Sequence, residues 1–312
     1  MATNKNITMK QFNGTDYDTL YPKTIASQVD GVLPTQILVT TFPNVEVTAS
    51  LNGKTISAMS DSSGLAILKI PSYGTWTVSG TVGGIFISID CEIKAVAQYE
   101  LAFFPVLETV SWDDISFISE SGNAASVWSV GDTKTVNFNG VDYQAQIIGF
   151  DHDTKTSGGK AGITFQFVKC VKTKYEMNDS GTNVGGWKSC NMRTSTMPAL
   201  LTKLPSELQN VIKDVNKLTS AGNSSATINT TSDKLFLLSE VELFGSVINS
   251  VSGEGTQYAY YKAGNSKNKS QHWWVRSPVK NSSTQFCYID VAGQSDTYEA
   301  NKIVGVSFAF CV

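Results

Sequence analysis

The sequence predicts a mainly β protein in which a small β-sandwich is followed by a larger α+β domain. Its 312 residues suffice for two domains at about 150 residues each. Short segments that alternate apolar and polar residues are separated by turn residues along the chain. Charged residues make up 16% of the chain, against about 25% in an average soluble protein. This composition favours a β-rich extracellular or virion protein over a helical cytosolic enzyme.

The charge balance argues against nucleic-acid binding. The chain has 24 Lys and Arg against 27 Asp and Glu, a formal net charge of −3, and therefore no basic footprint. Its most apolar stretch, residues 84–90, is too short to span a bilayer, so we expect no membrane insertion. Residues 1–6 are not followed by the apolar core of a secretory signal, so we expect none.

Residues 1–35 are expected to dock on a partner rather than to fold alone. Asn13-Gly14 predicts a tight turn between two short apolar pieces. The aromatic residues Phe12, Tyr17 and Tyr21 are isolated and cannot form a core by themselves. They need another domain or another subunit to pack against.

Residues 36–108 predict a β-sandwich with an immunoglobulin-like arrangement. Residues 45–51 alternate with period two, Asn52-Gly53 gives a two-residue hairpin turn, and residues 55–59 return. About seven short strands at this spacing are typical of immunoglobulin-like sandwiches. The other predicted strands are 36–41, 66–70, 74–82 and 85–93.

Residues 109–312 predict a mixed domain. A hairpin around Asn139-Gly140 spans residues 136–147. Ser239 and Glu242 predict a capping box that opens a short helix, and Gly245 is expected to end it. A longer helix is predicted after Pro205, because apolar residues recur at helical spacing: Leu204, Leu208, Val211, Val215 and Leu218. Further strands are predicted at 163–168, 235–238, 286–291 and 303–310.

The five cysteines do not predict a disulfide framework. Their number is odd and no pair has CxxC spacing, which excludes zinc-knuckle and thioredoxin-like motifs. A core of this size does not need bridges, so we expect reduced, buried thiols. The cysteines are Cys91, Cys170, Cys190, Cys287 and Cys311.

The two histidines do not predict a metal site. His152 stands between Asp151 and Asp153, but neighbouring side chains on a strand point to opposite faces and a turn splays them. A loop with an Asx turn is the favoured interpretation of this tripeptide. His272 precedes two tryptophans and could lie at the rim of a pocket.

The carboxylates and hydroxyls do not predict catalysis. Asp113 and Asp114 fall at the domain junction, while Glu240 and Glu242 belong to the predicted capping box. A glycosidase would need two carboxylates facing one cleft. No G-x-S-x-G elbow occurs. We therefore expect no catalytic residue, no metal and no cofactor.

The segment 252–271 is the candidate ligand-binding surface. It combines flexible glycines with tyrosines and polar or basic residues, as adaptable binding loops do. The alternative is an ordinary strand that covers the core, in which Tyr258 and Tyr260 alternate with Gln257 and Ala259. Trp273, Trp274 and Arg276 are expected to be structural, with Arg276 pairing with a carboxylate beneath it. The candidate ligand-binding residues are Tyr258, Tyr260, Tyr261, Lys267, Lys269, Gln285 and Tyr288.

Three parts of the chain resemble known families. Residues 61–66, DSSGLA, resemble a turn of carboxypeptidase-regulatory-like and bacterial immunoglobulin-like modules, which act as spacers. Residues 12–24, FNGTDYDTLYPKT, resemble the opening of tail-fibre and other virion-surface proteins in phages of Firmicutes. Most of residues 109–312 is similar to a domain of unknown function that is common in gut bacteria and their phages. The motifs that carry this likeness are GFDHD, GWKSCNMR, FLLSEVE, WWVRSP and GVSFAFC.

This last resemblance implies a C-type-lectin-like domain, a fold shared with formylglycine-generating enzymes. Neither Cys287 nor Cys311 matches the cysteine pattern of those enzymes, so their activity is not implied. The resemblances imply a non-enzymatic phage protein on the virion surface, in a tail fibre, a baseplate or a capsid decoration. Residues 1–35 would bind other virion proteins, and the C-terminal domain would attach to a host glycan or to mucus.

A homotrimer is the expected assembly, since phage fibres commonly close around a threefold axis. Two alternatives to attachment stay open at this point. One is a structural virion component without a ligand, and the other is a cell-wall hydrolase.

Overall fold

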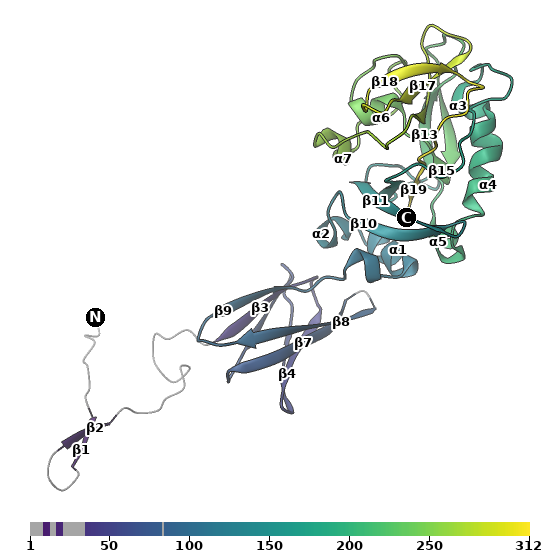
Figure 1. The fold of residues 1–312 in the computed structure, drawn as a ribbon. Helices are drawn as coiled ribbons and strands as arrows, with labels where there is room; N and C mark the ends of the chain where they lie inside the picture. The colour runs from purple at the N-terminus through teal and green to yellow at the C-terminus, as the bar shows by residue number, and fades with distance from the viewer. Residues whose placement is uncertain (1–8, 13–16, 21–34, 83) are drawn as a thin grey trace. The chain divides into compact units, whose positions relative to one another are not determined.

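The computed structural model describes residues 9–12, 17–20, 35–82 and 84–312 (Figure 1). The chain divides into two compact units, Met1–Phe104 (unit 1) and Pro105–Val312 (unit 2). The predicted fold class, mainly β with an α+β C-terminal part, is confirmed. In unit 1, β1 (Met9–Phe12) pairs with β2 (Tyr17–Leu20) in antiparallel fashion. The predicted Asn13-Gly14 turn and Tyr21 lie outside the described residues.

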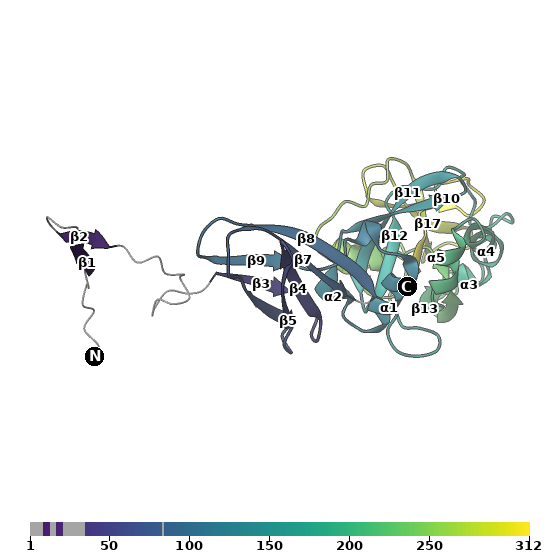
Figure 2. The same ribbon diagram turned by 90° about the horizontal axis from the view of Figure 1, so that it is seen from below.

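The remainder of unit 1 is a sandwich of two sheets (Figure 2). One sheet has the order β6-β3-β9 and the other β5-β4-β7-β8. Strand β3 pairs with β9 in parallel and with β6 in antiparallel fashion. The strands are β3 (Gln36–Thr40), β4 (Glu46–Leu51), β5 (Lys54–Met59), β6 (Leu65–Lys69), β7 (Gly74–Val82), β8 (Ile85–Ile93) and β9 (Gln98–Ala102).

The sandwich forms where the alternating pattern predicts it. On β4, Val47 and Ala49 are fully buried while their neighbours are more exposed, so one face of the strand meets the core. Asn52 and Gly53 both adopt positive φ, 50° and 77°, as the two-residue hairpin turn requires. The core of this unit is apolar, with Trp76 fully buried at its centre.

Unit 2 contains three sheets and several short helices. The largest sheet has the order β10-β11-β12-β19-β15, and the others are β13-β14 and β16-β17-β18. Its strands are β10 (Thr133–Phe138), β11 (Val141–Phe150), β12 (Ile163–Phe167), β13 (Val215–Ser220), β14 (Ile228–Asp233), β15 (Leu235–Phe236), β16 (Trp273–Pro278), β17 (Gln285–Ile289), β18 (Ser295–Glu299) and β19 (Ala309–Cys311). Its helices are α1 (Trp112–Glu120), α2 (Ala124–Val127), α3 (Gly186–Ser189), α4 (Met197–Leu201), α5 (Ser206–Val211), α6 (Glu240–Phe244) and α7 (Ala259–Lys262).

Several local predictions for unit 2 are confirmed. The Asn139-Gly140 turn joins β10 to β11, with φ of 52° and 79°. The capping box is present, since Ser239 accepts a hydrogen bond from the Glu242 amide and the Glu242 side chain accepts one from the Ser239 amide. Gly245 ends the helix with φ of 72°.

The predicted helix over residues 204–218 is wrong beyond Val211. Helix α5 covers Ser206–Val211, and Val215–Ser220 is strand β13 instead. In β13 the polar Lys217 and Thr219 are buried while Leu218 is 39% exposed. In a typical strand the apolar residues face the core, but here polar residues do. The apolar residues of this segment therefore recur at a spacing that predicts a helix.

Two strand predictions were too long. Residues 235–238 form only the short strand β15, and residues 303–310 form β19 near their end, with isolated bridges at Val304 and Gly305. All five cysteines are buried free thiols, as predicted. Within the described residues, no helix has both the length and the apolar character needed to cross a membrane.

Candidate functional site

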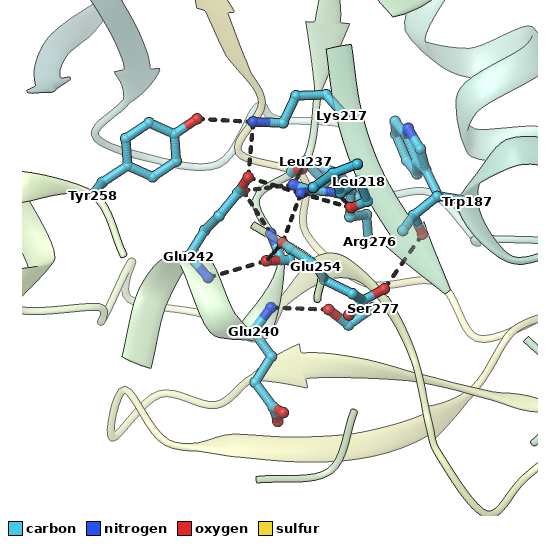
Figure 3. A network of polar contacts seen from close by, with 12 residues as sticks. Trp187, Lys217, Leu218, Leu237, Glu240, Glu242, Glu254, Tyr258, Arg276 and Ser277 are labelled. Carbon is cyan, nitrogen blue, oxygen red and sulfur yellow. Dashed lines mark hydrogen bonds and ion pairs between the residues drawn. The ribbon is translucent and has the colours of Figure 1, made fainter. Parts of the chain in front are cut away.

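A network of buried charges lies in the interior of unit 2 (Figure 3). Arg276 on β16 is fully buried and forms a two-pronged ion pair with Glu242 of α6. The two N···O distances are 2.5 and 2.7 Å. The remaining Arg276 donors bond to backbone carbonyls, including Leu237 at 2.8 Å and Leu218 at 3.0 Å. The predicted pairing of Arg276 with a carboxylate is therefore confirmed.

Lys217 extends this network toward the loop after β11. Its ammonium lies 2.8 Å from Glu242 and 2.6 Å from Asp153, and it donates to the Tyr258 hydroxyl at 3.0 Å. Tyr258 in turn donates to Asp153 at 2.8 Å. All three N–H groups of the Lys217 ammonium therefore have a partner. The ammonium also lies 4.2 Å from the ring centre of Phe236, a cation–π contact.

The pKa values of the carboxyls in this network follow from these partners. Burial by itself would raise the pKa of Glu242, but Arg276 and Lys217 outweigh it and hold that pKa below its ordinary value. Burial would also raise the pKa of Asp153, but the charge and hydrogen bond of Lys217 outweigh it and hold that pKa well below its ordinary value. Both carboxyls are therefore ionised and neutralised inside the protein.

Two further buried glutamates, Glu240 and Glu254, accept hydrogen bonds from backbone amides. Glu240 accepts hydrogen bonds from three consecutive backbone amides, residues 248–250, at 2.9 to 3.0 Å. In Figure 3 its carboxylate points away from Arg276. Glu254 accepts from the Ser220 amide at 2.7 Å, while its Oε2 has no partner among the described residues. Burial raises the pKa of Glu254 to about 7.

The network joins elements of unit 2 that lie far apart in the sequence. Its members come from β13, α6, β16 and the loops around residues 153, 254 and 258. Since Arg276, Lys217, Glu242 and Asp153 are paired with one another and closed to solvent, they fix the positions of these elements. We interpret the network as the scaffold of unit 2. Lys217 and Glu254 were missed by the sequence analysis, because nothing in their neighbourhood marks them as buried.

A cavity of about 170 Å³ opens beside the β10–β11 hairpin. We call it the tyrosine–lysine pocket, and define it by Asn139, Tyr143, Lys172, Tyr175 and Lys203. Both tyrosines are partly exposed, and both lysines reach its rim. Its size suits one small polar ring, since cavities for drug-sized ligands measure about 300–1,000 Å³.

Two larger cavities, of about 420 and 570 Å³, share the lining residue Ser232 at the end of β14. Arg193 lines the first of them, but its side chain is already bonded to Asp233 at 2.6 Å and to two carbonyls. Asp233 also accepts from Trp187 at 3.0 Å. The side chains of Arg193 and Asp233 are therefore committed to each other and to neighbouring groups of the protein.

The structure does not bring the predicted ligand-binding residues to one exposed surface. Tyr258 is fully buried in the charge network, and Tyr261 is buried with its hydroxyl on Gln166 at 2.5 Å. Lys269 is buried and donates to the Phe167 carbonyl at 2.8 Å, and burial lowers its pKa to about 8. The alternative, a strand in which Tyr258 and Tyr260 cover the core, is confirmed only for the burial of Tyr258, because Tyr260 is partly exposed and lies on the helix α7 (Ala259–Lys262).

The other predicted residues lie on separate elements. Tyr260 is partly exposed on α7, and the Lys267 ammonium lies 4.7 Å from the ring centre of Phe244. Gln285 is half-buried on β17. Tyr288, also on β17, is buried and donates to Asp296 at 2.9 Å. Trp273 and Trp274 are fully buried, which confirms their structural role.

The Asp151-His152-Asp153 loop splays its side chains, as predicted. Asp151 adopts a left-handed conformation with φ of 49°, while the His152 ring stacks on Tyr258 at 3.9 Å. Asp153 turns into the charge network. In the part of the chain that the structure describes, no three His, Cys, Asp or Glu side chains gather in a way that could hold a metal ion.

Residues 161–312, just under half of the chain, are similar to a family described as "Domain of unknown function (DUF6273)". Among solved structures, the chain is similar to one from a type II cohesin–X-dockerin complex of Acetivibrio cellulolyticus, a C-terminal interface mutant. That match has 18% identity and a TM-score of 0.21, and covers 31% of this chain and 81% of the other. A comparison with curated proteins gives no match. The predicted phage origin and C-type-lectin-like fold stay predictions.

Proposed function

We propose that this chain is a non-enzymatic phage protein of the virion surface, and that unit 2 attaches the particle to a glycan of the host cell or of mucus. The resemblance of residues 12–24 and of the motifs in residues 109–312 to phage proteins supports the virion setting. Docking through residues 1–35 and assembly as a homotrimer remain parts of this proposal.

The tyrosine–lysine pocket carries the proposal. Tyr143 and Tyr175 present partly exposed rings at a small open cavity, and lysine and asparagine side chains surround them. Aromatic faces pack against the C–H faces of sugar rings, and amide and ammonium groups bond to sugar hydroxyls. A rigid wall with these groups favours recognition of a saccharide.

The charge network favours binding over hydrolysis. Hydrolysis of a glycosidic bond uses two carboxyl groups that face one cleft. In unit 2 the fully or almost fully buried carboxyls with shifted pKa values are turned toward Lys217, Arg276 or the backbone; they are Asp153, Glu240, Glu242 and Glu254. None of the four lines the tyrosine–lysine pocket.

Binding of the full chain to a glycan array and to a panel of Firmicute cells tests this function. We expect binding by the native chain, and a loss of about tenfold or more for Tyr175→Ala, which removes a ring from the pocket. Tyr260→Ala is the matched control, since it removes a ring of the same unit that is partly exposed, as Tyr175 is, and that lies at the surface that the sequence predicted. A melting curve for each variant checks the fold.

Two outcomes would contradict the proposal. If the native chain binds no glycan and no cell, attachment is excluded and a structural virion component becomes the better interpretation. If Tyr260→Ala weakens binding and Tyr175→Ala does not, attachment runs through α7 rather than through the pocket.

A further inference from the structure

We infer that the tyrosine–lysine pocket binds an acidic sugar unit, that is, a sugar ring carrying a carboxylate or a phosphate. This inference rests on the proposed function, because it names the ligand class of the same unit. Four observations carry it: the rigidity of the walls, the free proton of Tyr143, the uncommitted lysines, and the absence of acidic groups from the lining.

The walls of the pocket are held by backbone hydrogen bonds. The Asn139 amide in the hairpin turn donates to the Lys203 carbonyl at 3.1 Å, which fixes the turn against the segment after α4. Tyr175 exchanges two backbone bonds of 2.9 Å with Val304, and its carbonyl also accepts from the Trp274 indole at 2.9 Å. A ligand therefore meets a preformed site, which reduces the ordering cost of binding.

Tyr143 is positioned to donate a hydrogen bond to a ligand. Its ring stacks on Phe167 with 5.3 Å between centroids and packs edge-on against Phe138, so the ring is fixed. Its hydroxyl accepts from the Lys172 amide at 3.0 Å. A phenol that accepts in this way keeps its own proton for another acceptor.

The lysines give the pocket a positive rim. Among the described residues, the ammonium groups of Lys172 and Lys203 form no hydrogen bond or ion pair with the protein. The stretch 165–175 contains Lys169, Lys172 and Lys174, and the acidic residue that follows it, Glu176, does not line the pocket. Such a rim attracts an anion, and its ammonium groups can form charge-assisted hydrogen bonds with it.

The nearest acidic residue on the hairpin faces elsewhere. Asp142 alternates with Val141 and Tyr143 along β11, so its side chain leaves the opposite face of the strand. There it accepts from Asn137 at 2.8 Å. The pocket near Ser232 differs in this respect, because its Arg193 is already neutralised by Asp233.

Titration of the full chain with three related sugars, followed by NMR, tests the inference. Glucuronic acid carries a carboxylate, glucose 6-phosphate carries a phosphate, and glucose carries neither. We expect at least one acidic sugar to bind about tenfold or more tightly than glucose. Binding should weaken between about 0.01 and 1 M salt, as the Debye length falls from about 30 to about 3 Å. The two acidic arms identify which anion is preferred.

Charge-removing variants locate the site. The double change Lys172→Gln and Lys203→Gln should weaken binding of the acidic sugar about tenfold or more and leave the melting temperature unchanged. Lys262→Gln is the matched control, since Lys262 is exposed in the same unit and does not line the pocket. Equal affinity for glucose, unchanged binding by the double variant, or no binding of any of the three sugars would each overturn the inference.

Failure of the inference and failure of the proposed function give different results. If the native chain and the double variant attach equally to cells, the anion site is wrong while attachment stands. If the native chain binds acidic sugars in the pocket but attaches to no cell or glycan, the inference stands and the attachment function fails.

Discussion

The cores of the two units differ in composition: that of unit 1 is apolar, while that of unit 2 also contains buried charged side chains. The sandwich of unit 1 is filled with apolar side chains, and Trp76, Val78 and Leu68 are fully buried. Its ion pair between Lys94 and Glu92 lies at the surface. Unit 2 instead places Arg276 and Lys217 among its most buried large side chains. Apolar packing therefore suffices for one unit, while the other depends on charges.

The difference concerns how each core tolerates change. An apolar core is limited by volume, so similar hydrophobic residues can replace one another at small cost. A buried ion pair contributes little net stability over an apolar substitute, but the loss of one partner leaves an uncompensated charge. Unit 2 is therefore expected to be more sensitive to single changes at its polar positions than unit 1 is at its apolar ones.

The largest expected effect is that of Arg276→Met. The variant leaves Glu242 buried without its two-pronged partner, and should cost unit 2 about 3–5 kcal/mol in its free energy of unfolding. Calorimetry of the full chain measures this, and the transition of unit 1 should not move.

The double variant Arg276→Met with Glu242→Gln is the control. It removes both charges at once and should recover a large part of the loss, because no unpaired carboxylate remains. If the double variant is as unstable as Arg276→Met, the cost comes from packing and not from the isolated charge, and the contrast between the two cores disappears.

The second prediction concerns the apolar core. Leu68→Ala on β6 empties space among fully buried neighbours and should destabilise the sandwich by about 2–5 kcal/mol. Urea unfolding followed through Trp76, the sandwich's tryptophan, measures it. Leu68→Met should cost much less, since it conserves volume. An equal loss for both variants would mean that this core is also position-specific.

The same contrast explains how far the sequence was informative. The sandwich was predictable because the rule that apolar residues face inward holds on its strands, as on β4. In β13 the rule fails, because Lys217 faces inward and Leu218 outward, so the apolar spacing of this strand predicts a helix. Arg276 and its pairing were predictable, since an arginine between buried strands needs a carboxylate.

The candidate site was harder to predict for a related reason. The predicted binding surface drew on one contiguous segment, but Tyr258 and Tyr261 are needed to fill and bond the interior. The tyrosine–lysine pocket instead combines a hairpin, the segment 171–175 and Lys203, which are distant in sequence. No periodicity relates such positions, so only the fold brings them together.

The third prediction uses pH to change the charge of Glu254 without changing the packing around it, and concerns the free energy of unfolding of unit 2. Burial raises the pKa of Glu254 from its ordinary 4.5 to about 7, so protonated Glu254 stabilises the folded state at low pH. That contribution is complete below about pH 4.5 and is lost as pH rises through about 7, a change of about 3 kcal/mol.

Glu254→Gln mimics the protonated acid and should lack this loss. The variant should match the native chain near pH 4.5 and exceed its stability above pH 8. The half-buried His152, whose pKa is lowered by desolvation, acts in the opposite direction, but it is common to both proteins and cancels in their difference. A difference that does not change with pH would show that Glu254 does not titrate in this range.

The smallest expected effect compares the same deletion in both units. Ser60 in the sandwich accepts from the Val45 amide at 2.8 Å and donates to the Phe42 carbonyl at 2.6 Å. Ser239 in unit 2 accepts from the Glu242 amide at 3.0 Å and donates to the Glu254 carbonyl at 2.6 Å. Both serines are buried. Ser60→Ala leaves two backbone groups without a partner, whereas Ser239→Ala leaves the Glu242 amide without one, because the Glu254 carbonyl still accepts from Arg276 at 3.1 Å.

Each variant should lose about 1–3 kcal/mol of unfolding free energy, the cost of unsatisfied buried groups. Ser239→Ala should lose more, because it also loosens the helix that aims Glu242 at Arg276 and Lys217. The free energies of unfolding of the two units, measured on the full chain, give the comparison directly. Equal losses would mean that the capping box acts locally. A larger loss for Ser239→Ala would mean that the Ser239 hydroxyl is energetically coupled to the buried charges of unit 2. Such coupling is not expected for Ser60, because the core of unit 1 is apolar.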